Sequence, residues 1–354
     1  MAKIVSVVGA RPQFIKAAPV CRALRGGPAR HAEILVHTGQ HYDPAMSDVF
    51  FDELGIPAPD HHLGVGSGPH GAQTGAMLAG IERILMDERP DTVLIYGDTN
   101  STLAGALAAA KMGIPAAHVE AGLRSYNRRM PEEINRVAAD HVASLLFCPS
   151  QSAADNLARE GIIRGVHVVG DVMADALADG SRRAEGRSSV LSRLGLEPGS
   201  FLLATIHRAE NTDDASRLRA IVDAFGRIGE PIVFPVHPRT RRALAALGDP
   251  QTGIASLKAI EPVGYLDMIM LERSARMILT DSGGIQKEAY WLGVPCLTLR
   301  GETEWVETVE AGWNKVVGTD GAAIVRAVRE FQPPASRPEL YGGPGASALI
   351  ASLL

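Results

Sequence analysis

The chain has 354 residues, of which 46% are hydrophobic and 21% are charged, and its formal net charge is −5. This length exceeds that of most single-core domains, so two domains are expected. The composition is that of a globular protein, and the slightly acidic balance excludes the basic footprint of a protein that binds nucleic acid or an anionic membrane.

Three cysteines, Cys21, Cys148 and Cys296, lie far apart in the chain, which is the pattern of neither a disulfide framework nor a metal site. The first apolar run is short and is followed at once by Arg11, unlike a secretory signal. No apolar stretch reaches the roughly 18 residues that would span a bilayer. We expect a cytoplasmic protein that holds no metal.

Short apolar runs alternate with helix-like segments along the first half of the chain. Five of these runs are expected to be β-strands, at residues 4–8, 33–37, 92–96, 116–119 and 145–148. The rhythm restarts after a polar stretch at residues 179–200, with further strands expected at residues 201–206, 232–236, 277–280 and 296–299. This alternation predicts parallel sheets in an α/β fold.

The restart predicts two Rossmann-like domains, residues 1–170 and residues 171–337, with a hinge near residues 170–200. Ligands of such sheets bind beyond the carboxyl ends of the strands. We therefore expect the active site in the cleft between the domains. The segment 338–354 is too short for a core of its own, and we expect it to pack on the first domain.

The residues that follow each expected strand carry most of the chemistry. After the first strand, Gly9 leads into a helix start that holds Arg11, Pro12 and Lys16. A guanidinium and an ammonium in this position suit the oxygens of a phosphate. The alternative is a pair of solvated cations on an amphipathic helix.

Two carboxylates also follow strands, Asp98 after the run 92–96 and Glu120 after the run 116–119. A carboxylate at a strand end points into the cleft, partly desolvated, and two of them suit proton transfer. The alternative for Asp98 is a helix cap. Glu120 has no such alternative.

A further helix is expected to begin at Pro131 and to carry Glu132 and Arg136 four residues apart on one face. This spacing most often marks an exposed, stabilising ion pair. Whether the pair has a further role depends on where the helix lies.

Histidines follow two of the expected strands in the second half, His207 with Arg208 after the first and His237 after the second. A single histidine is more often structural, but two at the mouths of adjacent strands suit the binding of a diphosphate or acid/base catalysis.

The segment from Asp281 to Glu288 reads as a strand end, a tight glycine turn and a helix start. Gly283 and Gly284 let the backbone approach a ligand closely, and the first N–H groups of a helix can receive a phosphate. Glu288 lies four residues after Gly284, where its carboxylate suits a diol such as a ribose. The alternative is an Asp or Ser282 helix cap with glycines for packing.

Together, these signatures resemble the non-hydrolysing UDP-N-acetylglucosamine 2-epimerase family. The segments that carry the resemblance are residues 9–16, 96–99, 118–124, 131–136, 207–208, 236–238 and 281–288. The resemblance implies a fold of the glycosyltransferase-B type, a homodimer, and reversible inversion at C2 that converts UDP-N-acetylglucosamine to UDP-N-acetylmannosamine without metal or nicotinamide. The partners it implies are the UDP-sugar substrate and UDP.

Family members are thought to eliminate UDP, which leaves a 2-acetamidoglucal, and to add it back with protonation from the other face. Proton removal and return at opposite faces need at least two acid/base groups. By resemblance, the catalytic residues are Asp98, Glu120, Glu132 and His207. The resemblance also implies that the second domain binds UDP. The residues that it assigns to the binding of substrate or UDP are Arg11, Lys16, Arg136, Arg208, His237, Ser282, Gly283, Gly284 and Glu288.

Many bacterial relatives are activated by a second substrate molecule beside the active site. Its polar ligands in those relatives correspond to Asp43, Ala72 and Ala209 here, although Gln40 and Gln73 remain. We therefore do not expect activation by that route.

Two other departures concern the sugar. Trp305 stands where many relatives carry an arginine, and Gln13 replaces a common glutamate. Both changes resemble the subgroup that acts on UDP-2,3-diacetamido-2,3-dideoxyglucuronate, which is the alternative substrate. The alternative from another class is a UDP-sugar glycosyltransferase of the same fold, although the first half shows no apolar patch for an acceptor.

Overall fold

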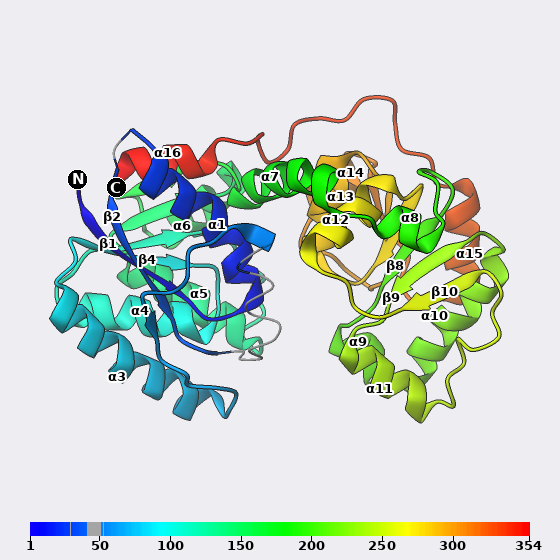
Figure 1. Ribbon diagram of the computed structural model, residues 1–354, viewed down its shortest axis with the longest axis horizontal. Coiled ribbons are helices and arrows are strands. Elements are labelled where there is room, and N and C mark those ends of the chain that lie inside the picture. The colour runs from blue at the N-terminus through cyan, green and yellow to red at the C-terminus, as the bar shows by residue number, and fades with distance from the viewer. Residues whose placement is uncertain (29, 41–50, 52) are drawn as a thin grey trace. The chain divides into compact units, whose positions relative to one another are not determined.

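The computed structural model describes residues 1–28, 30–40, 51 and 53–354. Within these residues the chain divides into two compact units: the first comprises Met1–Asp179 and Tyr341–Leu354, and the second comprises Gly180–Leu340. Each unit is built on one parallel sheet with helices packed on its faces (Figure 1). Asp43, considered above, lies outside the described residues.

The sheet of the first unit has seven strands in the order β3-β2-β1-β4-β5-β6-β7, all parallel. The strand order reverses between β1 and β4, and in open sheets of this kind ligands bind at that reversal. The strands are β1 (Lys3–Val8), β2 (Ala32–His37), β3 (His61–His62), β4 (Thr92–Tyr96), β5 (Ala116–Val119), β6 (Leu145–Cys148) and β7 (Val166–Val168).

Apolar side chains of the inner strands and of the helices α3 and α4 form the core of the first unit. All five residues of β4 are buried, as expected for a strand covered by helices on both faces. Within the part of this unit that the structure describes, the helices with defined bounds are α1 (Arg11–Gly26), α3 (His70–Glu88), α4 (Asn100–Lys111), α5 (Pro131–Val142), α6 (Gln151–Arg159), the first half of α7 (Val172–Arg187) and α16 (Ala346–Leu353).

The sheet of the second unit repeats the same plan with six parallel strands in the order β10-β9-β8-β11-β12-β13. Its strands are β8 (Leu202–Thr205), β9 (Ile232–Pro235), β10 (Leu257–Ile260), β11 (Met277–Thr280), β12 (Cys296–Thr298) and β13 (Asn314–Val316). Its helices after α7 are α8 (Val190–Leu194), α9 (Ala209–Thr212), α10 (Ala215–Ile228), α11 (Pro238–Ala246), α12 (Tyr265–Ser274), α13 (Gly283–Leu292), α14 (Val306–Glu310) and α15 (Gly321–Glu330).

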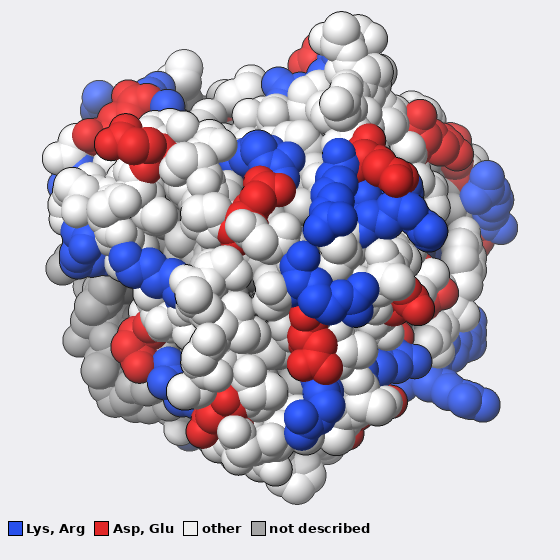
Figure 2. All heavy atoms as spheres, turned by 90° about the vertical axis from the view of Figure 1, so that its right-hand side faces the viewer, with Lys and Arg blue, Asp and Glu red and all other residues white. Residues whose placement is uncertain are grey.

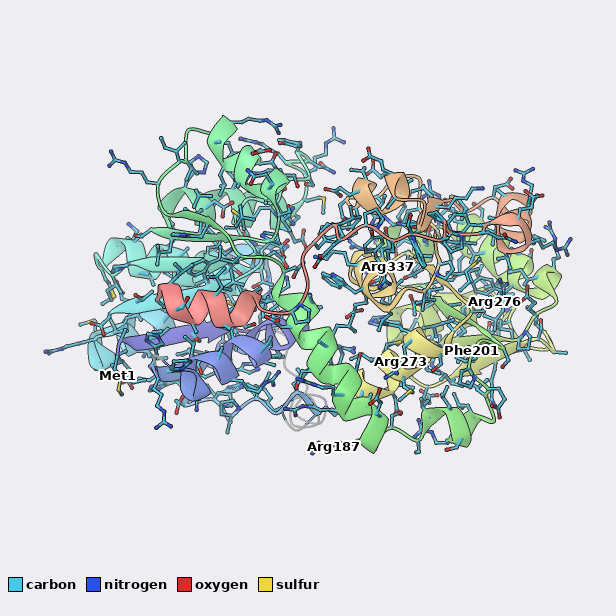
Figure 3. All side chains as sticks on the ribbon, turned by 90° about the horizontal axis from the view of Figure 1, so that it is seen from above. Met1, Arg187, Phe201, Arg273, Arg276 and Arg337 are labelled. Atoms are coloured by element: carbon cyan, nitrogen blue, oxygen red, sulfur yellow. The ribbon has the colours of Figure 1, made fainter. Side chains whose placement is uncertain are left out.

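The end of the chain returns from the second unit to the first. Arg337, on the returning segment (Figure 3), donates from Nη1 to the carbonyl of Tyr290 at 2.7 Å and lies near the ring of Trp313. In the first unit α16 packs on α1 (Figure 1), and a ring nitrogen of His31 lies 2.9 Å from the carbonyl oxygen of Ala351. The terminal helix thus packs against α1 as part of the first unit.

All nine strands expected from the sequence are confirmed, with ends that differ by one residue at most. The four strands that the sequence did not indicate are β3, β7, β10 and β13, which form the edges of the two sheets. The polar stretch 179–200 is largely helical, in α7 and α8. The division between the units falls inside α7, after Asp179, rather than at residue 170.

Positive and negative side chains are interspersed on the face that Figure 2 shows. Surface ion pairs such as Arg276–Glu230, with Nη2 and Oε2 2.8 Å apart, balance part of this charge. Among the described residues, no helix combines the length and the apolar character that crossing a bilayer requires.

Candidate functional site

The carboxyl ends of β1, β4 and β5 bring four ionisable side chains of the first unit together. These strands are neighbours in the sheet, so the residues that follow them meet at one edge. Lys16 comes from the second turn of α1, Asp98 follows β4, Glu120 follows β5, and Arg136 comes from α5. All four are among the residues that the sequence singled out.

Lys16 and Glu120 form a close ion pair, with Nζ 2.7 Å from both carboxylate oxygens. Their side chains are only 12% and 13% exposed, so Lys16 is not a solvated helix cation. Burial by itself would lower the pKa of Lys16, but the carboxylates of Glu120 and Asp98 raise it above its ordinary value. Lys16 therefore keeps its positive charge beside the two carboxylates.

The backbone at Glu120 is in the left-handed region, with a φ of 72°. This conformation is uncommon for a residue with a side chain and occurs often at functional sites. The N–H groups of Glu120 and Ala121 both donate to the carbonyl of Phe147 at 3.1 Å, which holds the turn in place. The strained turn directs the Glu120 carboxylate toward Lys16.

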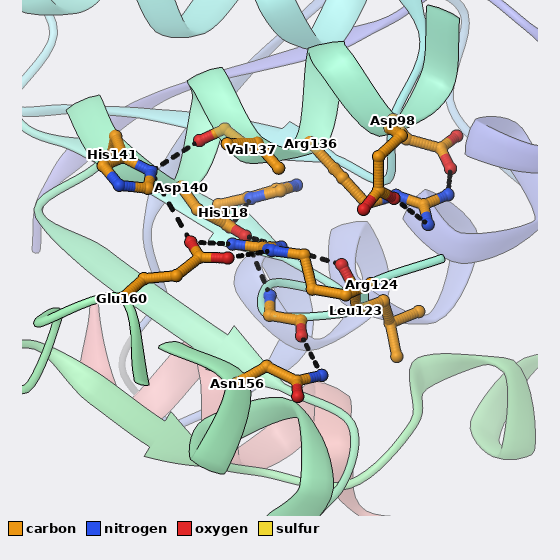
Figure 4. Close-up of polar contacts among 12 residues, drawn as sticks. Asp98, His118, Leu123, Arg124, Arg136, Val137, Asp140, His141, Asn156 and Glu160 are labelled. Carbon is orange, nitrogen blue, oxygen red and sulfur yellow. Dashed lines mark hydrogen bonds and ion pairs between the residues drawn. The ribbon is translucent and has the colours of Figure 1, made fainter. Parts of the chain in front are cut away.

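Asp98 does not cap the helix that follows it. The N-cap of α4 is Thr99, whose side chain accepts from the N–H of Thr102. The carboxylate of Asp98 instead forms an ion pair with the guanidinium of Arg136 (Figure 4). The cap interpretation of Asp98 is therefore wrong.

Arg136 pairs with Glu133 and not with Glu132. Its Nη1 lies 3.1 Å from Glu133 Oε2, whereas the side chain of Glu132 is exposed. Glu133 is 2% exposed and also accepts from the N–H groups of Ser125 and Tyr126 at 2.9 and 2.8 Å. The helix starts at Pro131, as expected. The expected i, i+4 ion pair of Glu132 with Arg136 does not form, because Glu133 faces the interior and takes the place of Glu132.

Gln13 is a structural residue that the sequence indicated only as a departure from the family. Its Oε1 accepts from the N–H groups of Gly9 and Ala10 at 2.8 and 3.1 Å, and its Nε2 donates to the carbonyl of Tyr96 at 2.9 Å. At 1% exposure it is out of reach of a ligand and holds the ends of β1 and β4 together. Arg11, at the first position of α1, is exposed beside it.

In the second unit, Asp281 joins the ends of β8 and β11, the two strands between which the strand order reverses. It is fully buried and accepts from the backbone N–H groups of His207 and Arg208 at 3.0 Å and from Asn211 Nδ2 at 3.0 Å. Asp281 therefore fixes the backbone of His207 and Arg208. His207 Nδ1 lies 3.5 Å from the same carboxylate.

The two histidines expected at adjacent strand mouths do lie close together. The ring centroids of His207 and His237 are 5.7 Å apart, because β8 and β9 are neighbours. His237 is also the N-cap of α11, where its side chain accepts from the N–H of Arg239 at 3.2 Å. One ring nitrogen of His237 thus has a local structural use.

The segment between β11 and α13 shows the Ser282 helix cap that was the alternative interpretation of this motif. Ser282 is the N-cap of α13, and its Oγ lies 3.5 Å from the N–H of Ile285. Gly283 and Gly284 form the first positions of the helix, and Glu288 lies on it with 7% exposure. The N–H groups of this first turn can bind an anion, because they have no partners within the helix.

The described residues hold no group of three or more His, Cys, Asp or Glu side chains that could bind a metal. In the first unit, paired carboxylates next to cations suit proton transfer, and in the second unit a helix N-terminus beside Arg208 suits a phosphate. Sequence reasoning missed the supporting residues Glu133 and Gln13. Gln13 contacts Tyr96, 83 positions away, and Glu133 contacts Ser125 and Tyr126 in the loop before its helix, so the local pattern of the chain records neither contact.

Comparison with known proteins gives consistent results. The family model described as UDP-N-acetylglucosamine 2-epimerase matches residues 27–354. A UDP-N-acetylglucosamine 2-epimerase homolog of Methanococcus maripaludis is 53% identical over 98% of this chain and 97% of its own length. A UDP-2,3-diacetamido-2,3-dideoxy-D-glucuronate 2-epimerase of Pseudomonas aeruginosa is 49% identical over 99% of both chains. The solved structure of the Methanocaldococcus jannaschii UDP-GlcNAc 2-epimerase in complex with UDP-GlcNAc and UDP has a TM-score of 0.89, 43% identity and 99% coverage of both chains.

Proposed function

The chain belongs to the UDP-N-acetylglucosamine 2-epimerase family, and from this premise we propose that it interconverts UDP-N-acetylglucosamine and UDP-N-acetylmannosamine by inverting C2 of the sugar. The observation that carries the proposal is the pair of carboxylates at the ends of β4 and β5. Asp98 is held by Arg136, and Glu120 by Lys16 at 2.7 Å. Two carboxylates with separate cationic partners suit a reaction that removes a proton on one face and returns it on the other.

The proposed reaction has two half-reactions. A base removes the proton from C2 while the bond from C1 to the diphosphate oxygen breaks, which leaves a C1–C2 double bond in a 2-acetamidoglucal, together with UDP. The diphosphate oxygen then adds back to C1, and an acid delivers a proton to the opposite face of C2. Asp98, Glu120, Glu132 and His207 are the proposed acid/base groups, and Lys16, Arg11 and Arg136 would stabilise charge on the carboxylates or the leaving diphosphate.

UDP must stay bound between the half-reactions, because the leaving group becomes the nucleophile. We assign its diphosphate to the turn Ser282–Gly284, with Arg208 and His237, and its ribose to Glu288. The support for this assignment is the first turn of α13, with Gly283 and Gly284 at its start and no β-carbon to block a phosphate.

The decisive experiment incubates the protein with UDP-N-acetylglucosamine in D2O, without an acceptor, and follows C2 by NMR. Epimerisation through proton loss places deuterium at C2 and produces the manno epimer. No exchange would contradict the proposal for this sugar, and transfer that requires an acceptor would favour the glycosyltransferase alternative. As a matched control, Glu120→Gln should abolish exchange and leave UDP binding within a few fold.

The second candidate substrate is UDP-2,3-diacetamido-2,3-dideoxyglucuronate, and the 49% identity with the Pseudomonas relative favours it. Gln13 does not discriminate between the sugars, because its amide is used inside the first unit. Trp305 lies in the loop beside Gly283, with Lys287 Nζ 4.0 Å from its ring centroid, and is the better candidate for a sugar-selective position. Parallel D2O experiments with both sugars decide which is turned over.

We also propose that the enzyme works as a homodimer in the cytoplasm. The apolar surface that supports a dimer lies at the ends of α3 and α4, where Met86 is 61% exposed beside Leu85 and Met112. Cys21, Cys148 and Cys296 are buried free thiols, as expected in a reducing compartment. Light scattering on the purified protein tests the dimer, with Met86→Asp as the variant expected to dissociate it, and cell fractionation tests the compartment.

A further inference from the structure

His118 lies on β5, two residues before Glu120, and is fully buried. Both of its ring nitrogens face acceptors at 2.7 Å: Nδ1 faces Oδ1 of Asp140, and Nε2 faces the carbonyl oxygen of Gly97. A carbonyl oxygen can only accept a hydrogen bond, so Nε2 of His118 carries a proton and donates it to Gly97.

Asp140, on α5, is the partner of the other ring nitrogen (Figure 4). It accepts from His118, from the N–H of Gly122 at 3.1 Å and from Arg124 Nη1 at 2.6 Å. Burial by itself would raise the pKa of Asp140, but His118 and Arg124 hold it below its ordinary value. The carboxylate of Asp140 therefore orients the His118 ring.

Arg124 in turn is held by Glu160 through two hydrogen bonds, Nε to Oε1 at 2.7 Å and Nη2 to Oε2 at 2.8 Å (Figure 4). This bidentate pair uses the donors of Arg124 that do not face Asp140. Arg124 thus links the carboxylate of Asp140 to that of Glu160.

Gly97 is the residue through which His118 reaches the candidate active site. Its N–H donates to the carbonyl of Val119 at 3.0 Å, and its own carbonyl accepts from His118. Its φ is 62°, and a Cβ atom there would lie 3.2 Å from Lys16 Nζ and 3.7 Å from Glu120 Oε1. The backbone before Asp98 thus passes directly beside the Lys16–Glu120 pair.

Asp98 follows at once, and the next peptide is also fixed, because Asn135 Nδ2 donates to the Asp98 carbonyl at 3.0 Å. The peptide before Asp98 depends on His118, and the peptide after it depends on Asn135. His118 lies on β5 and Glu120 follows the last residue of that strand, so His118 links the backbone of one carboxylate to that of the other.

We propose that His118 is a positioning residue, whose hydrogen bond from Nε2 fixes the Gly97 carbonyl and thereby sets the placement of Asp98 relative to Glu120. This role rests on the proposed epimerisation, since it is the two carboxylates that must address opposite faces of C2. His118 touches neither the sugar nor UDP in this role. It acts on the rate through the backbone.

Two neutral variants separate this role from a general contribution to packing. In His118→Gln the amide nitrogen occupies about the place of Nε2 and can still donate to Gly97, whereas in His118→Asn it occupies about the place of Nδ1 and reaches Asp140 alone. We expect kcat to fall about 10²-fold in His118→Asn, because a misplacement of a catalytic group by about 1 Å costs that much. In His118→Gln the loss of kcat should be smaller by a factor of about ten or more. UDP affinity and KM should stay within about threefold in both variants. A displaced Asp98 weakens the stabilisation of the transition state and not the binding of the ground state.

Equal kcat in the two variants, or a loss that appears in KM alone, would overturn the proposal. The wild-type protein supplies a second test that needs no variant to fold. With 15N-labelled histidine, Nε2 of His118 should carry a slowly exchanging proton, and an Nε2 without a proton would overturn the proposal. This readout does not depend on turnover, so it separates failure of the positioning role from failure of the proposed reaction, which the D2O experiment on the wild type reports.

Discussion

The carboxylate of Glu304 lies against Gly283, so closely that a Cβ atom on Gly283 would come within 2.3 Å of Glu304 Oε1. The same carboxylate lies 2.7 Å from Arg300 Nη1 and 3.7 Å from Arg208 Nη2. The cations hold the pKa of Glu304 below its ordinary value, although burial acts in the opposite direction. A carboxylate of the protein itself thus lies beside the segment that we assign to the diphosphate of UDP.

The first prediction follows from the negative charge of Glu304. Glu304→Gln should bind UDP about two- to fivefold more tightly than the wild type, because an anion near a helix N-terminus and near Arg208 competes with a phosphate, and such surface-level effects amount to about 0.5–1 kcal/mol. Titration calorimetry with UDP measures this. Glu302→Gln makes the same charge change at an exposed position of the same loop and should alter affinity less. Weaker binding in Glu304→Gln would show that the carboxylate is itself a ligand of UDP.

The second prediction compares the two glycines of the turn. Gly283→Ala should lower the free energy of unfolding by about 1–3 kcal/mol, because its methyl group meets Glu304. Gly284→Ala should leave stability unchanged or slightly higher, because the nearest atom to its Cβ is Ser282 Oγ at 3.9 Å and alanine favours a helix. Both should weaken UDP binding if the phosphate approaches this backbone. Thermal unfolding measures the stability of the two variants, and titration with UDP measures their affinity. Unchanged UDP affinity in Gly284→Ala would contradict the assignment of the diphosphate to this segment.

The third prediction separates two neighbouring glutamates. Glu133→Gln should lower the free energy of unfolding by about 1–3 kcal/mol, because Glu133 is buried and accepts from Ser125, Tyr126 and Arg136, which one amide oxygen cannot satisfy. Glu132→Gln should leave stability within about 0.5 kcal/mol, because Glu132 is exposed, and should reduce C2 exchange in D2O. Urea unfolding and the NMR assay measure the two properties. Unchanged exchange in Glu132→Gln would remove Glu132 from the proposed acid/base groups.

The fourth prediction concerns acid stability. The pKa of Asp140 is lowered in the folded protein, so the unfolded chain takes up the proton first as the pH falls. The stability that ionised Asp140 contributes is therefore complete above the ordinary carboxyl pKa of about 4 and is lost as the pH falls below it. Asp140→Asn should be less stable at pH 7 and should lose less of its remaining stability between about pH 6 and pH 3 than the wild type does.

Melting temperatures across this pH range test the prediction. Asp213→Asn serves as the control, because Asp213 is a surface residue whose pKa is lowered mainly by its hydrogen bond with Arg239. The melting temperature of Asp213→Asn should fall with decreasing pH as steeply as that of the wild type, because solvent screens the ion pair of Asp213 with Arg239. An acid limb in Asp140→Asn as steep as in the wild type would contradict the assignment of Asp140 as a buried, ionised group.

The fold was predictable where burial was continuous and not where it was partial. The inner strands, such as β4 with five buried residues, are recognisable as apolar runs because helices cover both of their faces. The four edge strands carry mixed sequences, such as the two histidines of β3 and the Leu-Lys-Ala-Ile of β10, because one side of an edge strand has no neighbour. Short apolar runs are the signal on which strand prediction depends, and edge strands lack it.

The candidate site was predictable in its chemistry, because parallel strands that start in a buried core must end at one edge, and their following residues meet there. The sequence by itself therefore determined the two parallel sheets, the strand-end residues Asp98, Glu120 and His207, and the helix start at Gly283 and Gly284. Only the tertiary structure decided which groups pair. Arg136 meets Asp98 across 38 positions, and His118 reaches Asp140 and Gly97 across 22 and 21 positions, respectively. Such contacts depend on how separate segments pack against one another, and no local periodicity in the chain records them.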